Sequence, residues 1–197
     1  MIKALLLIFE PGITWDRVVQ AKRSLRSVLL SFLLPTVLLS LVGELFGLLY
    51  WGKKNQVLGD VTPISRDLAL YYGTAQFFAS LAVVFIGAKL VHSVAGTIRS
   101  RNTPTQSFTL MAYTLSPLFL VRLLDALPSM NPWVTLGIGL LLSLTVLYQG
   151  LPKLLNPDPP QAFGLYLMAG LVLIIINALG RVLTEMVLMQ GKLTLFQ

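Results

Sequence analysis

Residues 113–128 read YTLSPLFLVRLLDALP, an apolar run that contains two opposite charges, Arg122 and Asp125. A charged side chain at the centre of a bilayer costs about 2.5–3.5 kcal/mol on insertion scales, so we expect it to be paired, near a boundary or functional. The residues around these two are apolar enough to lie in hydrocarbon. The stretch therefore indicates a membrane span, and its two charges need an explanation.

The whole chain has the composition of an integral membrane protein. Of its 197 residues, 55% are hydrophobic and 12% are charged, and the mean hydropathy is +0.78. Soluble domains average about 25% charged residues. The chain has no cysteine, which excludes disulfides, thiolate metal sites and cysteine nucleophiles. We attribute the net charge of +7 to basic residues that flank the spans, and we expect no nucleic-acid partner.

The hydrophobic pattern predicts an all-α membrane protein, with five transmembrane helices and a short amphipathic N-terminal segment. A span needs about 20 mostly apolar residues. The five candidates cover, approximately, residues 28–50, 68–91, 106–127, 133–151 and 162–180. Prolines in the segments PSMNP and NPDPPQ separate the last three. The fifth helix can continue through RVLTEMVLMQ, where Arg181 and Glu185 have the i,i+4 spacing of an ion pair.

Residues 1–27 are predicted to form a cytoplasmic, interfacial segment, and residues 28–197 a membrane domain. The first apolar run is too short for a span and lacks the small-residue cleavage site of a signal peptide. We expect a short interfacial helix with Trp15 at the level of the headgroups. Basic side chains here would bind anionic headgroups at about 1 kcal/mol per charge. They are Arg17, Lys22, Arg23 and Arg26.

The distribution of lysine and arginine predicts the orientation, because these residues accumulate on the cytoplasmic side. Nine lie on the side of the N-terminus: Lys3, Arg17, Lys22, Arg23, Arg26, Lys89, Arg99, Arg101 and Lys153. Five lie on the other side: Lys53, Lys54, Arg66, Arg181 and Lys192. We therefore predict a cytoplasmic N-terminus and a C-terminus outside.

With this orientation, the intramembrane charges gather near the outer ends of the spans. Glu44 lies about 9 Å below the outer end of the first span, at 1.5 Å per residue. Arg122 and Asp125 are three residues apart and are expected to pair, with Arg122 also binding Glu44. Such a cluster has two interpretations: an ion-pair network that fixes helix packing, or a polar cavity that binds a ligand or ion.

No catalytic or metal-binding pattern stands out. His92 is the only histidine, so neither a two-histidine metal site nor a serine–histidine triad with a nucleophile elbow is apparent. The Gly-Lys-Ser/Thr core of a phosphate loop is also missing. We predict no enzyme activity, no catalytic residue, no metal and no cofactor.

Other residues predict features of helix packing. Gly43 and Gly47 have the spacing that allows close helix approach. Pro35 and Pro117 should each bend a span, and the hydroxyl of Ser116 can satisfy a carbonyl that Pro117 leaves free. Five aromatic residues near span ends are interpreted as interfacial anchors. They are Trp51, Tyr71, Tyr72, Trp133 and Tyr148.

The segments AYTLSPLFLVRLLDALPSM and LLSLTVLYQGLPKLLNPDPPQAFGLYL resemble the core of the Yip family of Ypt-interacting, or Rab-interacting, integral membrane proteins, and more closely its short bacterial members. The likeness is most specific from residue 113 to residue 166. Its motif positions in this chain are Tyr113, Ser116, Pro117, Tyr148, Gly150, Pro152 and Lys153.

The resemblance implies five spans, a cytoplasmic N-terminus and a C-terminus outside. Eukaryotic members carry a long hydrophilic N-terminal region and act in Rab-dependent vesicle traffic. Because only residues 1–27 precede the first span here, we expect no Rab-binding role and a bacterial inner membrane location.

Two functional hypotheses follow. The first is a non-enzymatic scaffold or adaptor in membrane organisation or a trafficking-like process, with membrane lipids and an unidentified protein, or a second copy of the chain, as partners. The second is a small-solute or ion transporter that uses Glu44, Arg122 and Asp125. A cavity that reaches Glu44 favours transport, whereas a dry, mutually paired cluster favours the scaffold.

Overall fold

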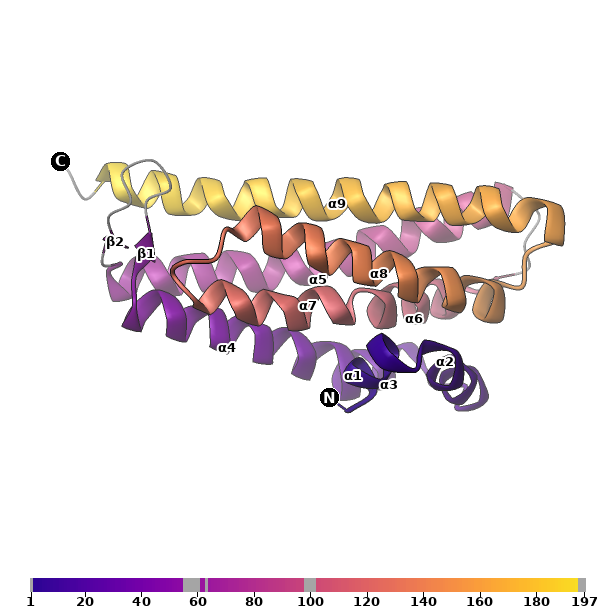
Figure 1. Ribbon diagram of the computed structural model, residues 1–197. Helices are drawn as coiled ribbons and strands as arrows, with labels where there is room; N and C mark the ends of the chain where they lie inside the picture. Colours follow the sequence, from indigo (N-terminus) through magenta and orange to yellow (C-terminus); the bar gives the residue numbers. More distant parts are fainter. Residues whose placement is uncertain (1, 55–60, 63, 98–101, 195–197) are drawn as a thin grey trace.

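The computed structural model describes residues 2–54, 61–62, 64–97 and 102–194 and shows a bundle of long helices (Figure 1). Within these residues, five helical stretches are long and apolar enough to cross a membrane. They are Leu25–Tyr50, Arg66–Thr97, Pro104–Ala126, Pro132–Leu155 and Pro159–Met189. The predicted fold class is confirmed. The division at residue 27 and the orientation stay predictions, and Arg99 and Arg101, which entered the charge count, lie outside the described residues.

The first stretch consists of α3 (Leu25–Val28), a π-helical turn η1 (Leu29–Leu33) and α4 (Leu34–Tyr50). Ser24 starts it, because its hydroxyl accepts a hydrogen bond from the Ser27 N–H at 3.3 Å. Pro35 has no N–H to donate to the preceding turn, and the wide turn η1 comes directly before it. The distortion expected at Pro35 therefore takes the form of a π-helical turn.

The third stretch is broken into α6 (Pro104–Thr114), α7 (Ser116–Val121) and a 3₁₀ turn η2 (Arg122–Ala126). The break lies at Leu115, next to Pro117. The Ser116 hydroxyl donates to the Tyr113 carbonyl at 2.7 Å. Pro117 would otherwise leave this carbonyl without its helical donor, so the role predicted for Ser116 is confirmed.

The remaining elements are β1 (Lys53–Lys54), β2 (Val61–Thr62), α5 (Arg66–Thr97), α8 (Pro132–Leu155) and α9 (Pro159–Thr194). The two short strands pair antiparallel. The helix of the fifth span continues well beyond residue 180, as the sequence predicted. This extension carries Arg181 and Glu185 on the same helix that crosses the membrane.

Small residues let α4 approach η2 closely. A Cβ added at Gly47 would overlap the backbone of Ala126, and one added at Gly43 would lie 2.5 Å from the Leu123 side chain. The close approach predicted from the Gly43–Gly47 spacing is confirmed. This approach brings Glu44, which lies between the two glycines, to the turn that carries Arg122 and Asp125.

Two N-terminal helices, α1 (Ile2–Phe9) and α2 (Pro11–Gln20), pack against α7 and α8. Trp15 on α2 is fully buried, and its Nε1 donates to the Val146 carbonyl on α8 at 3.0 Å. Its ring lies edge-on to Tyr113, with 6.0 Å between ring centroids. Trp15 is therefore enclosed by the protein and does not contact lipid headgroups, and its depth in the membrane stays a prediction. A tryptophan with an internal acceptor for its N–H can be buried completely, and here it attaches α2 to the bundle.

Lys153 completes this attachment from the same helix α8. Its Nζ donates to the Gly12 carbonyl at 2.7 Å and lies 2.6 Å from Asp16 Oδ1. A Cβ added at Gly150 would overlap the indole ring of Trp15. We call the group formed by Trp15, Asp16, Val146, Gly150 and Lys153 the N-terminal clamp.

The substitution Gly150→Ala should destabilise the protein by about 1–3 kcal/mol, because the added methyl group displaces the rigid indole ring and its hydrogen bond. The measurement is unfolding of the purified protein in detergent. Gly137→Ala, on the same helix with nothing within 4 Å of the added Cβ, is the matched control. Equal stability of the two variants would contradict the clamp.

Candidate functional site

The buried charges of the bundle are organised around Arg181 on α9, whose side chain is 2% exposed. Its Nη1 lies 3.6 Å from Glu44 Oε1 on α4 and 3.2 Å from Asp125 Oδ2 on η2. Its Nη2 lies 3.2 Å from Glu185 Oε1, one helical turn further along α9. The i,i+4 pair expected from the sequence is confirmed. One guanidinium thus joins three elements that are far apart in the chain.

Neutral side chains orient the two buried carboxylates. The Tyr72 hydroxyl on α5 donates to Glu44 Oε1, and the Thr135 hydroxyl on α8 donates to Asp125 Oδ1. Tyr72 is 1% exposed, so its interpretation as an interfacial anchor was wrong. Each carboxylate therefore has both a positive partner and a hydroxyl donor, which is the condition for keeping a charge in a low-dielectric interior.

Arg122 is held by neutral groups. Its Nη1 donates to Ser80 Oγ on α5 at 3.3 Å. With the Gln76 amide oriented so that its oxygen faces Arg122, that oxygen accepts from Nη2 at 3.1 Å and the amide nitrogen donates to Thr184 Oγ1, also at 3.1 Å. Gln76 thereby connects Arg122 to α9.

The pairing predicted between Arg122 and the two carboxylates was wrong. Among the described residues, Glu44 and Asp125 form their ion pairs with Arg181, and Arg122 forms none. Arg122 and Asp125 lie on a 3₁₀ turn, and Arg122 contacts α5 whereas Asp125 contacts α8 and α9. The structure does bring the three predicted residues into one layer with Arg181.

We call this layer the charge network and define it by its members. All five membrane-spanning stretches contribute to it: Glu44, Tyr72, Gln76, Ser80, Arg122, Asp125, Thr135, Arg181, Thr184 and Glu185. The four charges of Glu44, Asp125, Arg122 and Arg181 balance one another. Breaking a buried ion pair by removing one partner typically costs about 3–5 kcal/mol, because the other charge stays buried. The network therefore favours one arrangement of the spans.

A cavity of about 80 Å³ opens beside the network, at the end of the bundle that carries the turn between η2 and α8. Its lining includes Glu44, Tyr72, Asp125 and Arg181. Glu44 Oε2 has no hydrogen-bond partner among the described residues. The space is large enough for a few water molecules. No group of three or more potential metal ligands occurs in the described part of the chain.

The motif positions lie apart from the charge network. Gly150 and Lys153 belong to the N-terminal clamp, and Tyr113 stacks on Phe32 of η1 with 4.0 Å between ring centroids. Pro152 lies inside α8 next to Lys153, and Tyr148 is exposed. Three of the seven motif positions, Tyr113, Gly150 and Lys153, therefore act in attaching α2 and η1 to the bundle.

Three of the four residues expected to bind lipid headgroups are exposed. Arg17, Lys22 and Arg26 are open at the surface around α2 and α3. Arg23 is half-buried and donates to Ser31 Oγ at 3.2 Å. The exposed three can contact anionic lipid, whereas Arg23 is engaged within the protein.

Pairing of Glu44 with Arg181 predicts non-additive substitutions. Glu44→Gln and Arg181→Gln should each lower the free energy of unfolding by about 3–5 kcal/mol, and the double variant should lose less than the sum by about 0.5–3 kcal/mol. The measurement is a double-mutant cycle by thermal or denaturant unfolding. The Glu44→Gln, Arg122→Gln cycle is the control and should show a smaller coupling. A larger coupling in the control would contradict the assigned pairs.

Comparisons with known proteins agree with this architecture. The chain matches the family model described as the Yip1 domain over residues 5–180. This range includes α2, the N-terminal clamp and every motif position, and it ends one residue before Arg181. No curated protein and no solved structure matches. Because the model covers most of its length, the chain belongs to the Yip family of membrane proteins.

Proposed function

We propose that this protein is a non-enzymatic membrane scaffold or adaptor that organises lipids or partner proteins in a trafficking-like process. The observation that carries the proposal is the charge network. Its two buried carboxylates are compensated by Arg181 and by two hydroxyl donors, so they serve the packing of the five spans. A solute site instead needs several polar groups that stay available to the solute, whereas Glu44 and Asp125 each already have a cation and a hydroxyl partner, with Glu44 Oε2 left without a hydrogen-bond partner among the described residues.

The cavity beside the network favours the same conclusion. Ligand pockets for small organic molecules have volumes of about 300–1,000 Å³. The cavity of about 80 Å³ is much smaller. Deeper in the bundle, the spaces beside Arg122 are about 10 Å³ each, the size of a single water. A cavity reaches Glu44, as a transporter requires, but it is too small for an organic solute, and the spaces beside Arg122 are separate from it.

Lipid is the partner best supported by the surface. Arg17, Lys22 and Arg26 are exposed on and after α2, which follows the apolar helix α1 in the chain, and basic side chains at a membrane surface attract anionic headgroups. We assign this surface to the cytoplasmic leaflet of a bacterial inner membrane, with the N-terminus inside and the C-terminus outside. An unidentified protein or a second copy of the chain is a further proposed partner.

Thermal unfolding of the detergent-purified protein tests this proposal. A ligand of the folded state raises the unfolding midpoint by mass action. We expect anionic lipid to raise the unfolding midpoint. The triple variant Arg17→Gln, Lys22→Gln, Arg26→Gln should lose most of this rise, since each charge contributes about 1 kcal/mol to the binding of anionic lipid. Arg66→Gln, at the start of α5, is the control and should keep the rise.

Small solutes and inorganic ions form the second arm of this test. The proposal predicts no rise in the midpoint with amino acids, sugars or monovalent ions. A rise with one of these solutes that disappears in Glu44→Gln would contradict the scaffold and support transport.

A further inference from the structure

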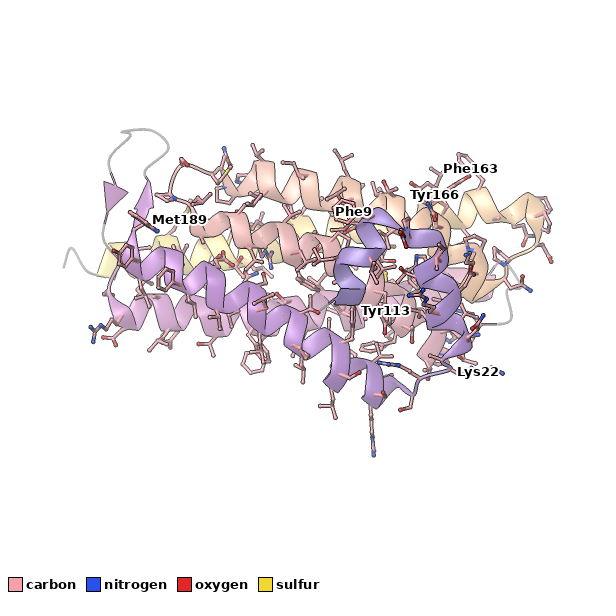
Figure 2. The ribbon with its side chains drawn as sticks, turned by 60° about the horizontal axis from the view of Figure 1, so that its bottom comes forward. Phe9, Lys22, Tyr113, Phe163, Tyr166 and Met189 are labelled. Atoms are coloured by element: carbon pink, nitrogen blue, oxygen red, sulfur yellow. The ribbon has the colours of Figure 1, made fainter. Side chains whose placement is uncertain are left out.

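The helices α1 and α2 lie across the bundle, whereas the five spans run along it. Figure 1 shows them at one side of the bundle, and Figure 2, turned by 60°, shows the same two helices running across the long ones. The described residues at the opposite end add only the short strands β1 and β2 to the long helices. The protein is therefore wider in one half of its length than in the other.

The depth of α1 follows from what it contacts. It packs on α7, which begins halfway along the third stretch, Pro104–Ala126. If that stretch crosses the bilayer, α1 lies among the acyl chains near the middle of the bilayer. The clamp holds α2 near the far end of α8, where Lys153 and Asp16 are partly exposed. The two helices thus extend from the middle of the bilayer to the headgroups on the N-terminal side.

One face of these helices is buried and the other is open. Ala4, Leu7 and Trp15 are fully buried against the bundle. Leu5 and Phe9 on α1 are 51% and 80% exposed, Ile13 on α2 is 55% exposed, and we call these three the apolar stripe. Figure 2 labels Phe9 on this open face.

Two observations identify lipid as what covers the stripe. The stripe lies at acyl-chain depth beside α7, and the exposed Arg17, Lys22 and Arg26 follow it in the chain. Apolar residues near the bilayer middle, followed in the chain by exposed basic side chains toward the headgroups, complement the acyl chains and phosphates of an anionic leaflet. A helix of eight residues, about 12 Å long and about 10 Å wide, displaces on the order of 100 Å² of that leaflet.

We propose that α1 and α2 form a rigid wedge in the N-terminal leaflet that gives the protein a preference for membranes in which this leaflet is convex. The wedge deepens the proposed lipid contact and rests on it. The N-terminal clamp makes the wedge effective, because helices fixed to the bundle cannot leave the leaflet when it is compressed. Binding of in-plane helices is sensitive to curvature for the same reason.

The absence of cysteine allows a direct test. Gln20→Cys, at the exposed end of α2, places a single thiol on the N-terminal side. The protein is reconstituted into small sonicated vesicles and large extruded vesicles of phosphatidylcholine and phosphatidylglycerol. An impermeant maleimide then reports the ratio of N-terminal-out to N-terminal-in molecules. We expect this ratio to be about twofold or more higher in small vesicles, as a shift between two populations.

Two variants assign the effect to the wedge. A chain without residues 2–9, and a full chain with Leu5→Asp and Phe9→Asp, should both lose the dependence on vesicle size. Leu70→Asp with Leu183→Asp makes the same chemical change at two exposed positions of α5 and α9 and should keep it. Circular dichroism and the unfolding midpoint show whether each variant is folded. If the chain without residues 2–9 does not fold, the result of the full-length variant with Leu5→Asp and Phe9→Asp decides.

A ratio in the parent protein that is the same in both vesicle sizes would overturn the proposal, as would a folded variant that keeps the full dependence. The anionic-lipid midpoint shift, measured on the same samples, separates this result from the scaffold proposal. If anionic lipid still raises the unfolding midpoint but the orientation ratio is the same in both vesicle sizes, the wedge is excluded and the lipid contact is not. If the ratio depends on vesicle size but anionic lipid does not raise the midpoint, the contact with anionic lipid is excluded and the wedge is not.

Discussion

The arrangement of this bundle depends on the burial of one guanidinium. Arg181 is always charged, and the fifth span carries it into a layer where its side chain is 2% exposed. Burying such a group is costly unless opposite charges or hydrogen-bond acceptors lie close by, and for Arg181 the chain supplies carboxylates from α4, from η2 and from the next turn of α9. The ends of the first, third and fifth spans must therefore meet at one point. Close approach at Gly43 and Gly47, and the turn η2 in place of regular helix, fit this requirement.

The opposite half of the molecule is held by a different set of contacts. There, Trp15 occupies space that only a glycine at position 150 leaves open, and Lys153 binds both a carbonyl and a carboxylate of α2. The charge network fixes the spans relative to one another, and the clamp fixes the N-terminal helices to the spans. The family motif around Gly150 and Lys153 belongs to the N-terminal clamp, whereas Arg181 lies just beyond residues 5–180, which the family model matches. The charge network and the N-terminal clamp are separate in space, so substitutions can perturb one without the other.

Sequence reasoning gave the number of spans, the layer of buried charge and the close approach at Gly47, because each follows from hydropathy or local spacing. It assigned the wrong cation to Glu44 and Asp125. Which of two arginines faces a carboxylate depends on the rotation of each helix about its axis, which hydropathy and spacing along the chain do not determine. It also did not predict that Trp15 and Tyr72 are buried within the protein. An amphipathic aromatic near a span end suits an interface or a buried acceptor equally well, and the acceptors, Val146 and Glu44, are distant in the chain.

The most direct measurement is solid-state NMR of the protein in bilayers, with nitrogen-15 in arginine and carbon-13 in glutamate and aspartate. Through-space correlations report which guanidinium lies next to which carboxylate, and Arg122→Gln and Arg181→Gln samples assign the signals. The structure predicts correlations from Arg181 to the carboxyl carbons of Glu44 and Asp125, with distances set by its N–O separations of 3.6 Å and 3.2 Å. Correlations of these carboxyls that persist in Arg181→Gln and vanish in Arg122→Gln would contradict the charge network.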